Sequence, residues 1–202
     1  MSVRTLTLLA GCCLAVLVTM HAPQAAAQGN PVVVIETSQG NITAELDQAK
    51  APLSVANFLE YVESGHYSGT VFHRVIKTFM IQGGGFTVGE NDQLVPKTEG
   101  LRGQIVNQAT RNLQNRRGTV AMARGGGPDT ARQQFFINLD DNSSFDFKNP
   151  TPDGIGYAVF GRVTDGLNVV RDIGRVRTGE LAPDVPNEAV VITSITMIAA
   201  GP

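Results

Sequence analysis

The chain beyond residue 70 is divided into short segments rich in β-branched and aromatic residues, with glycine, asparagine or aspartate between them. The segments cover residues 71–76, 79–82, 119–123, 135–139 and 157–163. Runs of this length between turn residues are typical of β-strands. Many short strands in one chain favour a β-barrel or a β-sandwich.

Strands are also expected at both ends of this region. Residues 31–36 and 41–46 flank the turn at 37–40, so they predict an opening hairpin. Residues 190–198 alternate between apolar and polar side chains and predict a last strand. Pairing of this strand with the first would close the sheet.

Two segments have the pattern of amphipathic helices. Residues 52–63 begin with proline, are followed by Gly65, and carry apolar residues at a spacing of three and four positions, at Val55, Phe58, Leu59 and Val62. Residues 167–173 predict a second, shorter helix. The first helix is expected to cover one face of the sheet.

The N-terminal segment has the features of a signal peptide. Arg4 precedes an apolar run at 5–20, and three alanines at 25–27 offer a cleavage site, which we expect after Ala27. Residues 28–202 would then form one soluble domain in the periplasm or outside the cell. A lipoprotein is the alternative, because residues 9–12 (LAGC) resemble a lipobox, but apolar residues continue past Cys12 where a polar tether is usual.

Composition narrows the range of partners. The run at 5–20 is short for a membrane span, and no later segment approaches that length, so stable membrane insertion is not expected. Both cysteines, Cys12 and Cys13, lie in the signal segment. Without Arg4, 15 basic residues face 18 acidic ones, a charge of about −3 that argues against a nucleic-acid partner. Nothing predicts an obligate dimer, so a monomer is expected.

The usual catalytic and cofactor motifs are absent from the sequence. His66 and His73, the histidines after the signal segment, have no partner at metal-ligand spacing, so we expect a solvated His66 and a packed or rim His73. No serine lies in a GxSxG motif. The glycine triplets at 83–85 and 125–127 lack phosphate-loop spacing and predict tight turns or bulges. The sequence therefore predicts neither a metal nor a cofactor.

Residues 71–85 (VFHRVIKTFMIQGGG) stand out because they place an arginine among apolar and aromatic residues. In a continuous strand, alternation would put Phe72, Arg74 and Ile76 on one face, and His73 and Val75 on the other. From spacing alone, the preferred interpretation is a strand pair with a rim arginine whose stem packs on the core.

Four motifs, in order, resemble those of the cyclophilins, in particular their short bacterial secreted branch. They are FHRVIKTFMIQGG at 72–84, GTVAMAR at 118–124, QFFINL at 134–139 and YAVFGRV at 157–163. The resemblance extends from about residue 31 to residue 198. It implies a closed eight-stranded antiparallel β-barrel capped by two α-helices. It also implies a peptidyl-prolyl cis-trans isomerase that acts on proline-containing polypeptides.

The resemblance assigns roles to nine residues. Arg74, Phe79 and Gln82 correspond to catalytic positions. The substrate-binding positions are Met80, Ala123, Arg124, Phe136, Phe145 and Tyr157. Two departures concern Ser144, where many eukaryotic members have a tryptophan that contacts cyclosporin, and Gln133, where a small serine is common. The first predicts weak cyclosporin binding.

Prolyl isomerisation agrees with the absence of nucleophile and metal motifs from the sequence. Rotation about a peptide bond breaks no covalent bond, so it needs neither a nucleophile nor a metal. We therefore expect an isomerase that assists the folding of extracytoplasmic proteins. The alternative is a proline-peptide binding module or holdase chaperone with the same fold and little turnover. An exported hydrolase would need a nucleophile or a metal set that the sequence does not offer.

Overall fold

The computed structural model describes residues 29–198. The expected signal peptide, its cleavage site, the lipobox alternative and both cysteines lie outside the described residues. Within the described part, no helix is long and apolar enough to cross a membrane.

The described chain forms a single antiparallel sheet with the strand order β4-β5-β9-β8-β10-β2-β1-β11-β3-β6-β7. The strands are β1 (Val32–Thr37), β2 (Gly40–Leu46), β3 (Thr70–Val71), β4 (Arg74–Ile76), β5 (Met80–Gly83), β6 (Phe86–Val88), β7 (Leu94–Pro96), β8 (Thr119–Met122), β9 (Phe135–Asn138), β10 (Val159–Asp165) and β11 (Val191–Ile198). Two 3-10 helices, η1 (Glu90–Asp92) and η2 (Ser143–Phe145), lie in the connections.

The prediction of a closed eight-stranded barrel from the sequence is wrong. The sheet has eleven strands and curls into a half-barrel, because its end strands β4 and β7 have no pairing with each other. The central pairings were predicted correctly. β1 and β2 form the opening hairpin, and β11 pairs with β1 along its whole length.

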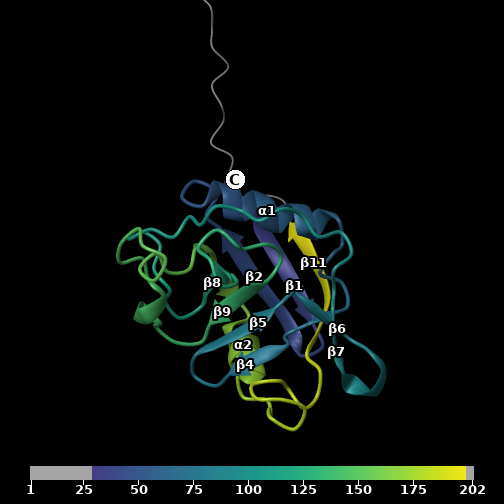
Figure 1. The fold of residues 1–202 in the computed structure, drawn as a ribbon. Helices are drawn as coiled ribbons and strands as arrows, with labels where there is room; N and C mark the ends of the chain where they lie inside the picture. The colour runs from purple at the N-terminus through teal and green to yellow at the C-terminus, as the bar shows by residue number, and fades with distance from the viewer. Residues whose placement is uncertain (1–28, 199–202) are drawn as a thin grey trace, which may run out of the picture.

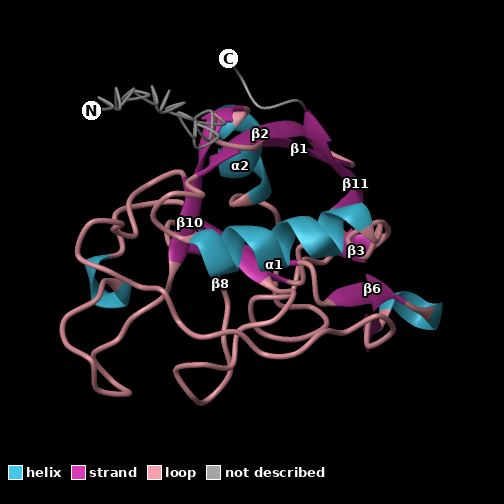
Figure 2. Ribbon diagram, turned by 90° about the horizontal axis from the view of Figure 1, so that it is seen from above, coloured by secondary structure: helices cyan, strands magenta, loops and turns pink. Residues whose placement is uncertain are grey.

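Two helices cover the ends of the curled sheet, as the sequence predicts. α1 (Pro52–Glu63) packs on β10 and β11, and α2 (Leu167–Ile173) packs on β2. Figure 1 shows α1 across one end of the strands and α2 near the other, and Figure 2 looks down on α1 in front of the curved sheet.

The main core lies between α1 and the concave side of the sheet. The Phe58 ring of α1 lies 5.1 Å from the Tyr67 ring, 5.4 Å from the Phe135 ring and 5.1 Å from the Phe160 ring. His66 also lies here, 5% exposed, with its ring 5.0 Å from the Tyr61 ring. The expected solvated His66 is therefore wrong, because the turn after α1 folds back onto the aromatic core.

Candidate active site

A second apolar cluster lies on the opposite face of the sheet from the main core. Along β5 and β9, Ile81 and Ile137 point into the main core, so their neighbours Met80 and Phe136 point outward. The buried members of this outer cluster are Met80, Ala121, Ala123, Phe136 and Val159. Phe79, Phe145 and Tyr157 pack against it and remain partly exposed. The result is an apolar surface on the outer face of the sheet, part of which is exposed.

Strand register brings Arg74 beside this cluster. Arg74 pairs with Gln82 across β4 and β5, and Gln82 pairs with Phe136 across β5 and β9. Phe136 in turn pairs with Ala121 of β8. Directly paired residues project to the same side of a sheet, so a cation, an amide and an apolar floor lie in one row.

The predicted strand over residues 71–76 is interrupted, and this corrects the position of Phe72. β3 ends at Val71 and β4 begins at Arg74, so alternation does not run through the intervening residues. Phe72 is fully buried in the main core, on the same side as Val75. Arg74 and Ile76 do share the outer face, as expected, whereas Phe72 does not.

Four aromatic rings pack together in this outer cluster. The centroid of the Phe145 ring lies 4.9 Å from that of Phe79, 5.6 Å from that of Phe136 and 4.4 Å from that of Tyr157. The Phe136 and Tyr157 rings meet edge to face at 5.7 Å. Such an aromatic surface suits a compact apolar ring, because aromatic faces remove the ring from water without needing polar partners.

Ala123 and Arg124 adjoin this cluster from the end of β8. The guanidinium of Arg124 stacks 4.6 Å from the Tyr157 ring centroid, and its Nε donates to the Gly156 carbonyl at 3.2 Å. Both residues line a neighbouring cavity of about 360 Å³, together with Gln82 and Gln133. All nine residues that the resemblance singled out therefore lie in or beside one site.

The Arg74 side chain is about half exposed and has an acidic partner. Its Nε lies 3.6 Å from Oδ2 of Asp184, in the segment between α2 and β11. The Asp184 carbonyl accepts a hydrogen bond of 2.7 Å from the Val75 backbone N–H. This segment therefore lies against β4 through both the backbone and the side chain of Asp184.

Gln82 is oriented by a second glutamine that the sequence analysis did not single out. Nε2 of Gln82 donates to Oε1 of Gln134 at 2.8 Å. The Gln134 side chain lies over Gly85, where a Cβ would overlap its amide. This close approach gives one physical reason for glycine at the end of the triplet at 83–85.

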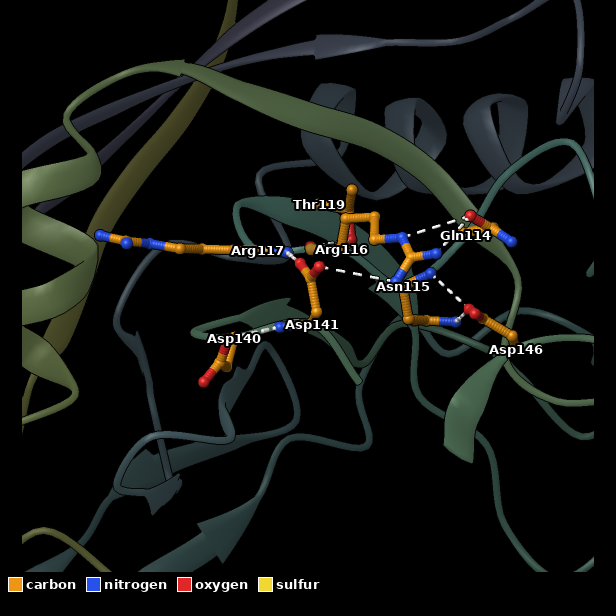
Figure 3. Close-up of polar contacts among 8 residues, drawn as sticks. All are labelled: Gln114, Asn115, Arg116, Arg117, Thr119, Asp140, Asp141 and Asp146. Carbon is orange, nitrogen blue, oxygen red and sulfur yellow. Dashed lines mark hydrogen bonds and ion pairs between the residues drawn. The ribbon is translucent and has the colours of Figure 1, made fainter. Parts of the chain in front are cut away.

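Three buried asparagines hold the backbone of the aromatic residues in the outer cluster. Nδ2 of Asn115 donates to the carbonyls of Phe145 at 3.0 Å and Tyr157 at 3.3 Å. Nδ2 of Asn142 donates to the carbonyl of Phe79 at 2.8 Å. Asn138 links the two, because it donates to Oδ1 of Asn115 and accepts from Asn142. Figure 3 shows Asn115 beside Asp146, whose carboxylate accepts from the Asn115 backbone N–H at 2.6 Å.

His73 is packed, as the sequence predicted, and lies in the connection between β3 and β4. Its ring lies 4.5 Å from the Phe86 ring. Burial lowers the pKa of His73 from its ordinary 6.5 to about 4, and the charge of Arg74 acts in the same direction. The imidazole is therefore neutral near pH 7, and it lies beside Gln134, the residue that orients Gln82.

No cluster of three or more potential metal ligands occurs among residues 29–198. The site combines two guanidinium groups, two amides and a partly exposed apolar cluster. Such a set can bind a proline ring and donate a hydrogen bond.

Comparison with known proteins decides the family. The model of the family "Cyclophilin type peptidyl-prolyl cis-trans isomerase/CLD" matches residues 32–197. The chain is a cyclophilin. Its function is peptidyl-prolyl cis-trans isomerisation, in agreement with its curated relatives and structural neighbours.

Bacterial cyclophilins are among its relatives. The chain is 49% identical over 170 residues to a peptidyl-prolyl cis-trans isomerase of Streptomyces antibioticus, covering 82% of this cyclophilin and 98% of that protein. It is 44% identical over 168 residues to peptidyl-prolyl cis-trans isomerase B of Escherichia coli, covering 82% and 99%.

Solved structures show the same fold. A cyclophilin-type isomerase of Cryptosporidium parvum superposes with a TM-score of 0.68 at 26% identity, covering 86% of this cyclophilin and 99% of that chain. The same protein has been solved in the presence of the dipeptide Ala-Pro, with a TM-score of 0.67, 26% identity, and coverage of 83% and 99%.

Proposed function

We propose that Arg74 is the catalytic group of this cyclophilin. In the twisted transition state the prolyl nitrogen regains a lone pair and becomes a hydrogen-bond acceptor, which it is not in the planar ground state. A fixed donor aimed at this nitrogen binds the transition state more strongly than the substrate, and this difference accelerates rotation. The row formed by Arg74, Gln82 and Phe136 is the observation that carries the assignment.

The outer cluster holds the proline ring in this proposal. Met80 and Phe136 form its floor, and Phe79, Phe145 and Tyr157 form its walls. Removal of water from the ring side of the bond strengthens the arginine hydrogen bond, because fewer competing donors remain. Gln82, fixed by Gln134, lies where it can bond the carbonyl that rotates.

The polypeptide on either side of the proline is expected to run along residues 123–124. Their segment lies at the end of β8 and lines the adjoining cavity of about 360 Å³. Contacts to the backbone of a client do not depend on its sequence. We therefore expect the enzyme to accept many different Xaa-Pro clients.

The proposed setting is the periplasm or the extracellular space. The N-terminal charge, apolar run and alanine triplet support export and membership of the secreted branch of the family. Uncatalysed prolyl isomerisation takes tens to hundreds of seconds, so an exported isomerase would assist folding there. Mass determination of the protein from a periplasmic extract tests this, with cleavage after Ala27 as the expected result.

Protease-free NMR exchange of a short Xaa-Pro peptide tests the catalytic assignment. The chain from Gln28 is compared with its Arg74→Ala variant, after both spectra are shown to be folded. Rapid cis-trans exchange that is lost in the variant supports the proposal. Equal exchange in both proteins rejects the role of Arg74, and peptide binding without exchange would instead favour a binding module.

A further inference from the structure

A cavity of about 270 Å³ lies between α2, the end of β9 and the turn that joins β4 to β5. Its lining contains none of the nine residues assigned to the isomerase site. Its volume is close to the lower limit for sites that bind small organic molecules.

The lining of this cavity is strongly basic. It includes Lys77 from the turn after β4, Arg117 from the segment before β8, and Arg171 and Arg175 from α2 and the turn after it. Asp140 is the one carboxylate among its lining residues. The whole chain has a formal charge of −2, so a general excess of basic residues does not explain this concentration. Like charges around one cavity repel each other, and a bound anion would relieve that repulsion.

The carboxylates of Asp140 and Asp141 contact other groups, so the Arg117 guanidinium is available to a ligand. Oδ1 of Asp141 accepts the backbone N–H of Arg117 at 3.0 Å, and Oδ2 of Asp141 lies 3.5 Å from Nη1 of Arg116. Asp140 accepts the backbone N–H of Asp141 at 2.8 Å. Figure 3 shows the Arg117 side chain extended away from both aspartates. Within residues 29–198, no ion pair involves Lys77 or Arg117.

The arginines of the α2 side have only loose acidic contacts. Arg171 Nε lies 3.6 Å, and Arg175 Nη1 lies 3.8 Å, from the same oxygen of Asp172. A guanidinium has five N–H donors, so each keeps most of them for another partner. Arginine forks match the oxygens of phosphate and carboxylate in pairs.

The cavity also offers apolar surface. Leu139, Leu167 and Val170 are among its lining residues, and Leu167 is 43% exposed. A hydrated inorganic ion would leave this surface in contact with water. An anion attached to a small apolar group would cover it and gain from its burial.

We propose that this cavity binds an organic phosphate, with the phosphate between Arg117 and the arginines of α2 and the organic part against Leu167. A phosphate ester carries close to two negative charges and three acceptor oxygens, which suits four basic side chains better than a single carboxylate does. The phosphate can belong to a free small molecule or to a phosphorylated side chain of a polypeptide. None of the nine residues assigned to isomerisation lines this cavity, so phosphate binding to it can be measured without an activity assay.

The test is a titration of the ¹⁵N-labelled protein with phenyl phosphate, followed by NMR. Saturable shifts are expected at the amides of Lys77, Arg117 and Leu167. Inorganic phosphate should bind more weakly and phenol should cause no such shifts. Absence of saturation by phenyl phosphate at millimolar concentration, or equal binding of inorganic phosphate, would overturn the proposed ligand class.

Two neighbouring arginines give a matched pair of variants. Arg117→Gln should weaken phenyl phosphate binding by roughly tenfold, because a charge-assisted hydrogen bond is lost. Arg116→Gln should leave the affinity unchanged, because Arg116 contacts Asp141 and Gln114 and does not line the cavity. Lys77→Gln provides a second test if Arg117→Gln folds poorly. Equal affinity in all these variants would refute the site.

A blocked phosphotyrosine peptide distinguishes the two sources of the phosphate. Tighter binding of this peptide than of phenyl phosphate would identify a phosphorylated polypeptide as the ligand. Equal or weaker binding would identify a free small molecule.

Discussion

In the catalytic role proposed for it, Arg74 must combine two properties that conflict in a half-exposed arginine. Its guanidinium has to remain accessible to a substrate, yet a flexible cation loses conformational entropy each time it forms a directed hydrogen bond. Asp184 addresses this conflict, because its carboxylate restrains Nε and leaves the other nitrogens free. Asp184 has a φ of 62°, a left-handed conformation that aspartate and asparagine tolerate better than most residues.

Asp184→Asn tests this restraint with little change to the backbone. Asparagine accepts the same φ and keeps the carbonyl that bonds Val75, so the fold should be retained. We expect kcat/KM to fall about two- to fivefold, the size of a partly exposed ion pair worth up to about 1 kcal/mol. NMR exchange on a proline peptide measures it. The loss should vanish in the Arg74→Ala background; a loss that persists there would show that Asp184 acts by another route.

Asn115→Ala should affect both stability and substrate binding. The change removes the donor to the Phe145 and Tyr157 carbonyls. It also removes one of the two acceptors of Asn138 Nδ2, which keeps its hydrogen bond to Thr119 Oγ1. Buried groups that lose their partners cost about 1–3 kcal/mol each, so the free energy of unfolding should fall by at least about 2 kcal/mol. Urea denaturation measures this.

The same variant should raise KM more than it lowers kcat, because the ring walls loosen while Arg74 stays in place. Asn112→Ala is the control, since Asn112 is exposed and lies three positions away. If Asn115→Ala loses stability but keeps its KM, the asparagines support the fold without positioning the pocket.

Arg74, Phe79, Gln82 and Phe136 were named from the motifs of the resemblance. Strand register brings Arg74, Gln82 and Phe136 into one row, and Phe79 packs against the same cluster, whereas their roles stay predictions. Asp184 and Asn115 were not predicted, because each depends on a partner distant in the sequence. Asp184 is 110 positions from Arg74, and Asn115 is 42 positions from Tyr157. A single asparagine or aspartate in a loop is also typical of an ordinary turn.

Among the elements, the helices were predicted most closely. α1 and α2 have the bounds that the apolar spacing, Pro52 and the following glycines indicate. Strands were less predictable, because β6 and β7 are three residues long and have too few positions to show alternation. The break between β3 and β4 was hidden because residues 71–76 are almost all of strand-forming types.

This break places His73 in a buried position, so the connection between β3 and β4 should be sensitive to acid. The folded pKa is about 4 and the ordinary value is 6.5, so between these values the unfolded chain binds the additional proton. The free energy of unfolding should therefore fall as pH decreases from 6.5 to 4, by up to about 3 kcal/mol from this group.

His73→Gln should remove most of that pH dependence. Denaturation of both proteins between pH 4.5 and 7 measures the difference between their free energies of unfolding. This difference also cancels the contribution of Glu45, whose pKa is lowered by hydrogen bonds to Asn30 and Arg162. Parallel pH curves for the two proteins would show that His73 is not the group responsible.

In the whole molecule, the two faces of the open sheet have different roles. The concave face forms the main core with α1, and the outer face of β5, β9 and β8 carries the outer apolar cluster. The predicted closure failed because alternation in β1 and β11 specifies their pairing but carries no information about β4 and β7. The site tolerates this difference, because its strands are adjacent in the order β4-β5-β9-β8.

This arrangement predicts an isomerase whose rate is independent of pH while the fold is intact. The mechanism proposed here uses a guanidinium donor and apolar contacts and includes no proton transfer. The value of kcat/KM should therefore stay constant from about pH 6 to pH 9, and it should decline in acid only where the His73-dependent unfolding begins. In His73→Gln the decline of activity and the decline of stability should move to lower pH together. NMR exchange measures the activity and circular dichroism measures the stability of the same samples. A bell-shaped rate profile in fully folded protein would mean that a proton transfer contributes to the reaction. The role proposed for Arg74 would then be incomplete.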